Sequence, residues 1–426
     1  MATNAARYGP NVPYKDQWGM IPFVAEAVQG RLDGALLWEQ VNEHRTPLPK
    51  LVVAALAWAT RWDVRWENGA DFVFALSAAG LLAAALARTV RPHAPALAPW
   101  LVLLASQLTF SLTQGYNWTW GSLMPTYLAT LATVSVAWTL AGFDGRWTGV
   151  VAMELSAIAA ALSFGAGVTL LFLVPVTILL APTTRPWRAR VPQAAAGVGV
   201  AGLLTAIYFH GWHPRFGDPA QPFALAKVPQ YLQFALAYLG SPIGARDVGE
   251  SACWGAAGVA LLAAGGGWLW WTSPAHRRAL LPWLLLATYT MANAALTAFG
   301  RLQNGLHIAL IARYAPTTAL FPLGALVVGG LAIAALTRRA RGPGIAAALL
   351  LVGALGVAAP KHYRASLEGV AAMRSLDAML RTGQACVTTC AATSARCFLD
   401  MCWSAQVAAQ MCPLMERLRF GLFAPR

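Results

Sequence analysis

The chain has 426 residues, of which 58% are hydrophobic and only 11% are charged. Ordinary soluble domains have roughly 45–50% apolar and about 25% charged residues, so this composition excludes a soluble globular protein and predicts an all-α integral membrane protein. The formal net charge of +14 would favour nucleic acid as a partner of a soluble chain. Here the basic residues gather in short gaps between apolar runs, as in polytopic membrane proteins, and we expect no nucleic-acid partner.

The apolar runs are expected to be membrane helices. A bilayer core about 30 Å thick needs about 20 apolar helical residues. Two of the runs are short and meet at Ser163–Gly167, and we interpret them as two helices rather than one kinked helix. The sequence predicts ten crossings, at residues 70–88, 98–114, 122–142, 149–163, 167–181, 194–209, 251–271, 280–298, 316–337 and 344–359.

Basic clusters predict the orientation of these helices. Positive residues favour cytoplasmic loops, so we expect all the clusters to lie at one cytoplasmic end. The long polar parts then face outside, which predicts an external N-terminal segment (1–69), a transmembrane domain (70–359) and an external cysteine-containing helical tail (360–426). Both ends are then outside and no apolar helix precedes residue 70, which leaves two alternatives: a hydrophilic N-terminal tail is translocated, or an eleventh, N-terminal helix is missing. The clusters are Arg88 and Arg91; Arg146; Arg185, Arg188 and Arg190; Arg277 and Arg278; Arg338, Arg339 and Arg341.

Several segments and one acid stand out from this pattern. Residues 22–38, 48–62 and 226–239 mix apolar and polar positions and are too short to span, so we expect helices lying along the outer leaflet. Glu154 is an acid that we expect at depth in the membrane. Such acids serve proton relays, but they also hydrogen-bond between helices, and both interpretations are open.

Two polar groups near the start of the chain are candidates for chemistry. Asp16 lies in the segment Lys15–Trp18, and Glu43, His44 and Arg45 follow Asn42 directly. A carboxylate at an apolar boundary can act as a base toward a hydroxyl or as a metal ligand. The alternative is a cluster of caps and salt bridges that anchors an amphipathic helix.

A second polar group lies between the last expected spans. It contains Arg301, His307, Arg313 and Tyr314. Arginine carries a planar fork of donors that suits phosphate oxygens, so these residues predict a phosphate-binding surface. The alternative is ion pairing with Asp247 or Glu250, or contact with lipid phosphate. The aromatic loop 115–121, with Asn117 and Trp120, is expected on the same face.

The six cysteines predict disulfide bonds if the tail is external, because that compartment is oxidising. Buried thiols are the alternative, and the spacings match no standard zinc pattern. The cysteines are Cys253, Cys386, Cys390, Cys397, Cys402 and Cys412.

Taken in order, the motifs resemble a group of bacterial membrane proteins with the layout of GT-C glycosyltransferases, which include lipid-linked sugar transferases. The resemblance implies a catalytic acid at Asp16, with Glu43 as a second acid, His44 as an orienting group and Arg45 as a phosphate contact. It also implies transfer of a sugar from a polyprenyl-phosphate carrier at the outer face of the inner membrane, with membrane lipids as partners. A transporter or flippase of a lipid-linked glycan, or a non-catalytic envelope subunit, is the alternative, and the metal requirement stays open. The motifs are Asp16-Gln17-Trp18, Asn42-Glu43-His44-Arg45, Asn117 with Trp120-Gly121, Ser163-Phe164-Gly165 with Gly167, Tyr238-Leu239-Gly240-Ser241-Pro242, Gly300-Arg301 and Arg313-Tyr314.

Overall fold

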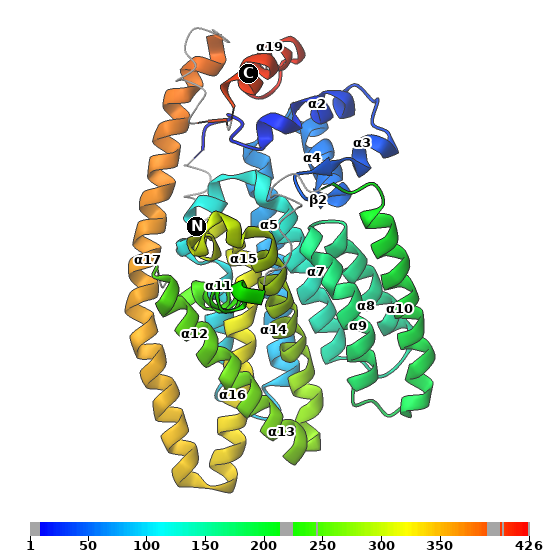
Figure 1. The fold of residues 1–426 in the computed structure, drawn as a ribbon, viewed down its shortest axis with the longest axis vertical. Coiled ribbons are helices and arrows are strands. Elements are labelled where there is room, and N and C mark those ends of the chain that lie inside the picture. Colours follow the sequence, from blue (N-terminus) through cyan, green and yellow to red (C-terminus); the bar gives the residue numbers. More distant parts are fainter. Residues whose placement is uncertain (1–8, 214–224, 244–245, 390–400, 403, 425–426) are drawn as a thin grey trace.

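The structure is a computed structural model, and it describes residues 9–213, 225–243, 246–389, 401–402 and 404–424. Within these residues the chain is almost entirely helical, and two short strands, β1 (Gln40–Val41) and β2 (His44–Arg45), pair in an antiparallel hairpin. Figure 1 shows long helices side by side below a cap of shorter elements. The expected all-α class is therefore confirmed.

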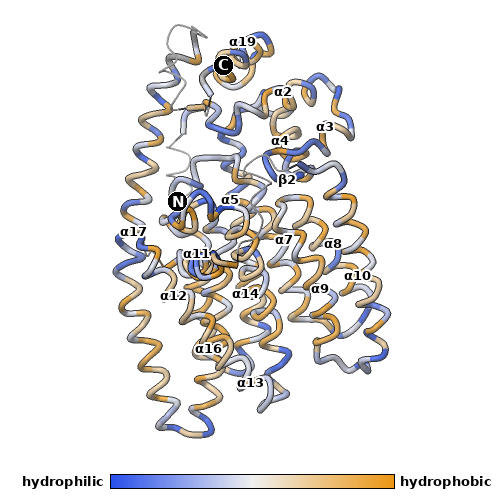
Figure 2. The backbone as a smooth tube through the Cα atoms, in the orientation of Figure 1, coloured by the Kyte–Doolittle hydropathy of each residue, from blue (hydrophilic) through white to orange (hydrophobic). Residues whose placement is uncertain are grey.

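Seven helices in the described part of the chain are long and apolar enough to cross a membrane, which indicates an integral membrane protein. Figure 2 shows that hydrophobic residues dominate these helices, while hydrophilic residues gather in the cap and in the turns at the lower end. The seven are α5 (Arg65–Thr89), α7 (Met124–Ala141) with the short turn before it, α10 (Trp187–Phe209), α12 (Val248–Leu261) continued through a π-helical turn (Leu262–Gly266) into α13 (Gly267–Thr272), α14 (Pro274–Arg301), α15 with α16 (Ala315–Thr318 and Leu320–Arg339), and α17 (Arg341–Thr389).

The prediction of ten full crossings is wrong. Every predicted span is helical, but α6 (Ala98–Thr109), α8 (Trp147–Ala161) and α9 (Val168–Leu180) have only 12, 15 and 13 residues. At a rise of 1.5 Å per residue these helices are about 18–23 Å long, which is short of a bilayer core of roughly 30 Å. The apolar run that begins at residue 98 continues past α6, but its end folds into the 3-10 helix η1 (Leu112–Thr119).

The short helices α8 and α9 are two separate helices, as expected. The 3-10 turn η3 (Gly165–Gly167) divides them, and they pack against each other. A Cβ atom at Gly167 would lie 2.2 Å from the carbonyl oxygen of Ala160, so only glycine fits this turn. Because the chain reverses there, Arg185 returns to the lower end and packs against Gly145, beside Arg146.

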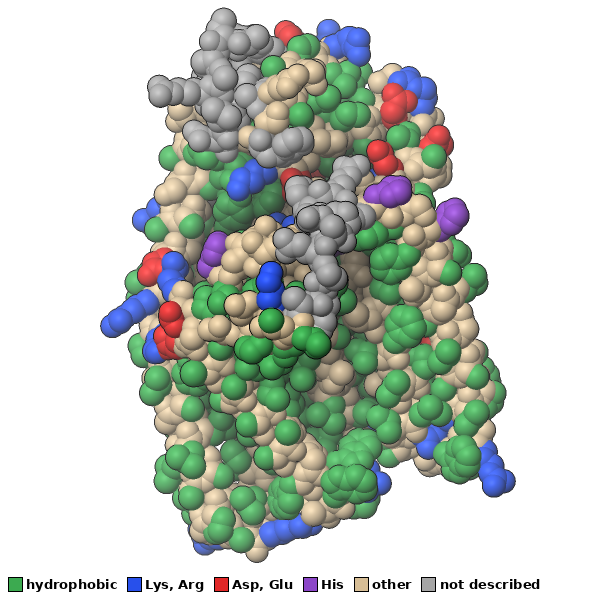
Figure 3. Space-filling view, in the orientation of Figure 1, with side chains coloured by type: hydrophobic (Ala, Val, Ile, Leu, Met, Phe, Trp, Pro, Cys, Tyr) green, Lys and Arg blue, Asp and Glu red, His purple; other side chains and the backbone are tan. Residues whose placement is uncertain are grey.

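The five arginine clusters lie together at the lower end of the molecule, which confirms the expected grouping. Figure 3 shows Lys and Arg side chains along this edge. Three arginines, two at the end of α16 and one near the start of α14, donate to backbone carbonyl oxygens of neighbouring turns, and these contacts hold the lower end together. They are Arg338 to His93 at 2.9 Å, Arg339 to Thr272 at 3.0 Å and Arg278 to Phe143 at 3.3 Å. Which compartment this end faces stays a prediction.

The N-terminal segment and the tail form one cap over the other end. The cap contains α2 (Gln17–Val28), α3 (Gly34–Trp38), α4 (Pro47–Thr60) and α19 (Ala405–Leu418). Here α19 packs on α2, and both contribute to one buried apolar cluster. The expected domain boundaries at residues 69/70 and 359/360 fall inside α5 and α17. The N-terminal segment and the tail are packed together as one structural unit, and α5 and α17 continue from this unit into the membrane domain without a break.

The three segments expected along the outer leaflet are helical with one correction. The single helix expected at 22–38 is wrong, because α2 ends at Val28 and Gly30 adopts a left-handed conformation (φ 72°) before α3. The expected helix at 48–62 is α4, and the one at 226–239 is α11 (Val228–Gly240). The structure contains no membrane, so their place along a leaflet stays a prediction.

The acid expected at depth, Glu154, is buried in α8, and its carboxylate accepts no hydrogen bond from the described residues. It lies against α9 and α10, close to Pro175 and Gly197. Asp71, which the sequence pattern did not single out, is a second acid inside a membrane helix. It is 0% exposed, and both its carboxylate oxygens likewise have no hydrogen-bond partner among the described residues.

The expectation of disulfide bonds in the tail is confirmed in part. Cys412, in the tail, takes part in a disulfide bond, which confirms a bridge there. Cys386, Cys390 and Cys397 lie outside the described side chains, so the pairing is left open. Cys253 is an exposed free thiol.

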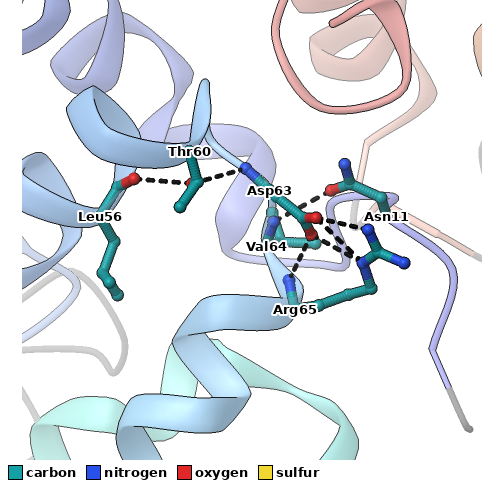
Figure 4. Close-up of polar contacts among 6 residues, drawn as sticks. All are labelled: Asn11, Leu56, Thr60, Asp63, Val64 and Arg65. Carbon is teal, nitrogen blue, oxygen red and sulfur yellow. Dashed lines mark hydrogen bonds and ion pairs between the residues drawn. The ribbon is translucent and has the colours of Figure 1, made fainter. Parts of the chain in front are cut away.

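The corner between α4 and α5 joins the cap to the membrane helices (Figure 4). The hydroxyl of Thr60 accepts a hydrogen bond from the backbone N–H of Asp63 at 3.1 Å. The Asp63 carboxylate accepts from the backbone N–H of Arg65 and also pairs with its guanidinium. Asn11 reaches in from the N-terminal segment, and its Oδ1 accepts from the N–H of Val64 at 3.0 Å. This network caps the start of α5 and fixes its position under the cap.

Thiol labelling tests the orientation. Labelling is measured as the increase over the Cys253→Ser parent, which keeps the tail cysteines, including the buried Cys402. A cysteine at exposed Arg31 in the cap and one at exposed Arg185 at the lower end lie at opposite ends of the molecule. We expect a membrane-impermeant thiol reagent to label Arg31→Cys in intact cells and Arg185→Cys only after the membrane is opened, because basic loops stay in the cytoplasm. The reverse pattern would overturn the orientation.

Candidate functional site

A cavity of about 590 Å³ lies where the cap meets the upper ends of the membrane helices. Its walls come from the start of α2, the β1–β2 hairpin, α4, the turn before α7, the α8–α9 turn and the ends of α10 and α14. Seven of the ten predicted site residues line it. They are Asp16, Glu43, His44, Trp120, Arg301, Arg313 and Tyr314. Segments nearly 300 residues apart in sequence thus meet in one site.

Asp16, at the start of α2, is a cavity carboxylate that belongs to none of the ion pairs of the described structure. Burial raises the pKa of the Asp16 carboxyl. The charges of Arg313 and Lys15 and a hydrogen bond from the side chain of Asn42 act in the opposite direction. A carboxylate whose proton affinity is raised in this way is suited to accept a proton from a hydroxyl group.

Glu43, the second predicted acid, is held in an ion pair. It lies in the turn of the hairpin, and its Oε2 is 2.8 Å from Nη2 of Arg301 at the end of α14. Both side chains are about four-fifths buried, with 18% and 21% exposed. Because its charge is matched and its oxygen occupied, Glu43 joins the cap to α14, and Asp16 is the better base.

His44 is a neutral imidazole in the wall of the cavity. Burial, with the positive charges of Arg301 and Arg313, lowers the pKa of His44 to about 4. The ring packs on Phe164 at 4.3 Å between centroids, and its Nδ1 has no hydrogen-bond partner among the described residues. A Cβ at Gly165 would lie 2.8 Å from this Nδ1, so glycine leaves the room that the imidazole needs.

Arg313 places a guanidinium in the cavity beside Asp16. Its charge lies over the ring of Tyr314 at 5.6 Å, and none of the ion pairs of the described residues involves it. Its buried Nε likewise has no hydrogen-bond partner there. Arg313 is therefore a cation available to an anionic ligand.

Three predicted site residues lie outside the cavity, and their predicted binding roles are corrected. Arg45 is a structural clamp whose guanidinium donates to the carbonyl oxygens of Trp38, Tyr208 and His210 at 2.7–2.8 Å. Asn117 is fully buried, and its Nδ2 donates to the carbonyl oxygen of Ala312 at 2.6 Å, which holds the loop before Arg313. His307 is exposed and is not part of the cavity wall.

Two charged residues of the cavity were missed at the level of sequence. Lys50 on α4 is 2% exposed, and its Nζ donates to the carbonyl oxygens of Leu36 and Glu39. Burial lowers the pKa of Lys50 to about 8. Glu67 on α5 is also 2% exposed. Its position one turn before Asp71, at the start of an apolar run, was the signal available in the sequence.

Exposed apolar side chains from the ends of α10 and α14 form one edge of the cavity, which we call its apolar mouth. Phe209, Leu296 and Phe299 line the cavity and are 48%, 49% and 60% exposed. Such large exposed apolar side chains beside membrane helices suit contact with lipid chains. Within the described residues no three His, Cys, Asp or Glu side chains lie close enough to hold a metal ion together.

Comparison of the chain with protein-family models, with curated proteins and with solved structures found no match. The resemblance to GT-C transferases therefore rests on the sequence motifs alone.

The raised pKa of Asp16 predicts that the Asp16→Asn variant is at least as stable as the natural protein at pH 7. Ionisation of Asp16 is less favourable in the folded than in the unfolded state, so its contribution to stability falls as the pH rises above about 3.9. We expect an equal or higher melting temperature for the variant at pH 7 and no difference at about pH 3.5. Thermal melting of the purified proteins measures this, and a clear drop at pH 7 would show that the carboxylate stabilises the fold.

Proposed function

We propose that this protein is a GT-C-type glycosyltransferase that moves a sugar from a polyprenyl-phosphate carrier to a hydroxyl acceptor at the outer face of the bacterial inner membrane. The observation that carries the proposal is the make-up of the cavity. One carboxylate and one guanidinium outside the described ion pairs, Asp16 and Arg313, lie in a cavity whose mouth is apolar. In this proposal the long and short helices together form a GT-C-like membrane domain.

The donor would bind by its two chemically different ends. The polyprenyl chain suits the apolar mouth at Phe209 and Phe299, where it stays in contact with the bilayer. The phosphate suits Arg313, whose fork of donors matches phosphate oxygens, with further positive charge from Arg301. The sugar then lies further inside the cavity, toward Asp16. No nucleotide sugar is needed.

The chemistry needs one base and one group that stabilises the leaving phosphate. Asp16 accepts the proton of the acceptor hydroxyl while the oxygen of that hydroxyl forms a bond to the anomeric carbon of the sugar. The bond between the anomeric carbon and the phosphate oxygen breaks, and its electron pair stays on the lipid phosphate. Arg313 stabilises the charge that develops there, as preorganised cations do in phosphate chemistry. The neutral His44 ring places no further charge beside this group.

Asp16→Asn is expected to abolish transfer and to leave donor binding intact. The substitution removes the base but no phosphate contact, and the amide is nearly the same size as the carboxyl. The measurement is sugar transfer and donor binding by purified protein in detergent, matched for folded amount. His307→Ala, outside the cavity, serves as the control and is expected to transfer normally. Full transfer by Asp16→Asn would remove Asp16 from the chemistry.

Arg313→Ala is expected to weaken binding of the lipid-linked donor. A lost charge-assisted contact is worth roughly 1.5–3 kcal/mol, which corresponds to about a ten- to a hundredfold loss of affinity. Titration of the purified variant with a polyprenyl-phosphate sugar measures this, with Arg31→Ala on the outer surface of the cap as the matched control. Unchanged affinity in Arg313→Ala would place the phosphate elsewhere.

A further inference from the structure

Glu67 connects the start of α5 to the segment that carries Asp16. Its carboxylate is buried in the wall of the cavity and accepts two hydrogen bonds. Nε2 of Gln17 donates to Oε2 at 2.6 Å, and Nε1 of Trp62 donates to Oε1 at 2.9 Å. Gln17 directly follows Asp16 in the sequence, so Glu67 holds the neighbour of the proposed base.

Gln17 in turn holds the turn that presents Asp16. Its Oε1 accepts from the backbone N–H of Tyr14 at 2.9 Å, and its own N–H donates to the carbonyl oxygen of Tyr14 at 3.1 Å. Between them Lys15 adopts a left-handed conformation (φ 48°), which residues other than glycine rarely adopt. The N–H of Lys15 also donates to the carbonyl oxygen of Met401 at 2.6 Å. The Gln17 amide is the side chain that holds this turn, with its oxygen toward Tyr14 and its NH₂ toward Glu67.

The surroundings fix Glu67 from the other side. A Cβ at Gly121 would lie 2.3 Å from Cβ of Glu67, so the chain before α7 packs directly on this side chain. Trp62, the second donor, is buried in the corner between α4 and α5 and also has a left-handed backbone (φ 54°). The carbonyl oxygen of the preceding Arg61 accepts from the N–H of Gly421, so the tail supports the corner.

We infer that Glu67 is a positioning residue for Asp16, acting through the side-chain amide of Gln17. A carboxylate accepts on both oxygens, and this makes it the acceptor for Gln17 and Trp62 together. An amide at position 67 accepts on one oxygen and turns its NH₂ toward one of the two donors. The inference rests on the proposed function in one respect, which is the role of Asp16 as the base.

Asp71 supplies a matched control. It lies one turn after Glu67 on the same helix and is fully buried, but it neither lines the cavity nor has a hydrogen-bond donor among the described residues. Asp71→Asn therefore removes a buried carboxylate of α5 without touching Gln17. It controls for the general effect of changing a buried acid in this helix.

The test is an exchange of the two side chains. In Glu67→Gln the NH₂ of the new amide faces either the NH₂ of Gln17 or the N–H of Trp62, so one hydrogen bond is lost. In Gln17→Glu two carboxylates face each other. In the double variant Gln17→Glu, Glu67→Gln every hydrogen bond is restored, and the bond between the two exchanged side chains has the reverse direction. The new carboxylate at position 17 accepts from the N–H of Tyr14 and from the new amide at position 67. The oxygen of that amide accepts from Trp62.

Two readouts separate this inference from the proposed function. The first is amide hydrogen exchange of residues 12–20 in the full-length protein. We expect faster exchange in each single variant, protection restored in the double variant and no change in Asp71→Asn. Unchanged exchange in Glu67→Gln, or no recovery in the double variant, overturns the positioning role whatever the enzyme does.

The second readout is sugar transfer. We expect kcat to fall by about ten- to a hundredfold in Glu67→Gln, as for small displacements of a reacting group, and to recover in the double variant. KM for the lipid donor is expected to stay unchanged, because Arg313 lies on another segment. If exchange follows the expected pattern while kcat does not, the coupling to the turn stands and Asp16 is not the base.

Discussion

A carboxylate withdrawn from water must accept hydrogen bonds or meet a cation to stay ionised, and this constraint organises the boundary between the cap and the membrane helices. Glu67, at the top of α5, accepts from Gln17 in the N-terminal segment and from Trp62 in the corner. Glu43, in the hairpin, pairs with Arg301 at the end of α14. Each of these acids therefore joins the cap to a different helix, and the cavity lies between these two joints.

The charged side chains of the cavity that do not take part in these joints are the ones available for chemistry. Two arginines of the predicted motifs show the difference between a structural charge and one that is available to a ligand. All three guanidinium nitrogens of Arg45 donate to backbone carbonyl oxygens, so its role is structural. Arg313 has a buried nitrogen without a partner in the described structure and an electrostatic interaction with Asp16. A partly buried carboxylate and guanidinium outside the described ion pairs are held there at a cost in stability, which is a common property of functional sites.

Much of the fold was predictable because membrane helices follow from length and hydrophobicity alone. Hydrophobicity does not show where within an apolar run the helix ends. For this reason α6, α8 and α9 were expected to span the membrane although their helices are too short. The grouping of the arginine clusters and of Asp16 with Arg313 followed from the alternation of crossings. The union of the N-terminal segment with the tail was not predictable, because it depends on contacts between residues as distant as Asn11, Arg61 and Gly421.

The site was predictable in its residue types and not in their roles. Asp16 and Arg313 were expected and lie in the cavity, whereas Arg45 carried the same signal and proved structural. Lys50 was missed because burial of a single charge on an amphipathic helix leaves no mark in sequence spacing. The spacing of Glu67 and Asp71 marks a pair of acids on one helix but does not reveal that Glu67 is buried against other segments. The burial of Lys50 and Glu67 depends on donors and acceptors in other segments, such as the carbonyl oxygen of Leu36 and the amide of Gln17.

Consumption of a lipid-linked sugar by this protein is measured most directly by the profile of polyprenyl-phosphate sugars and envelope glycans in a strain that lacks it. We expect one lipid-linked sugar to accumulate and one envelope glycan to lose the same sugar. Both changes should be reversed by the natural protein and not by the Asp16→Asn variant produced at an equal level. A profile identical to that of the parent strain would show that the protein does not transfer a lipid-linked sugar.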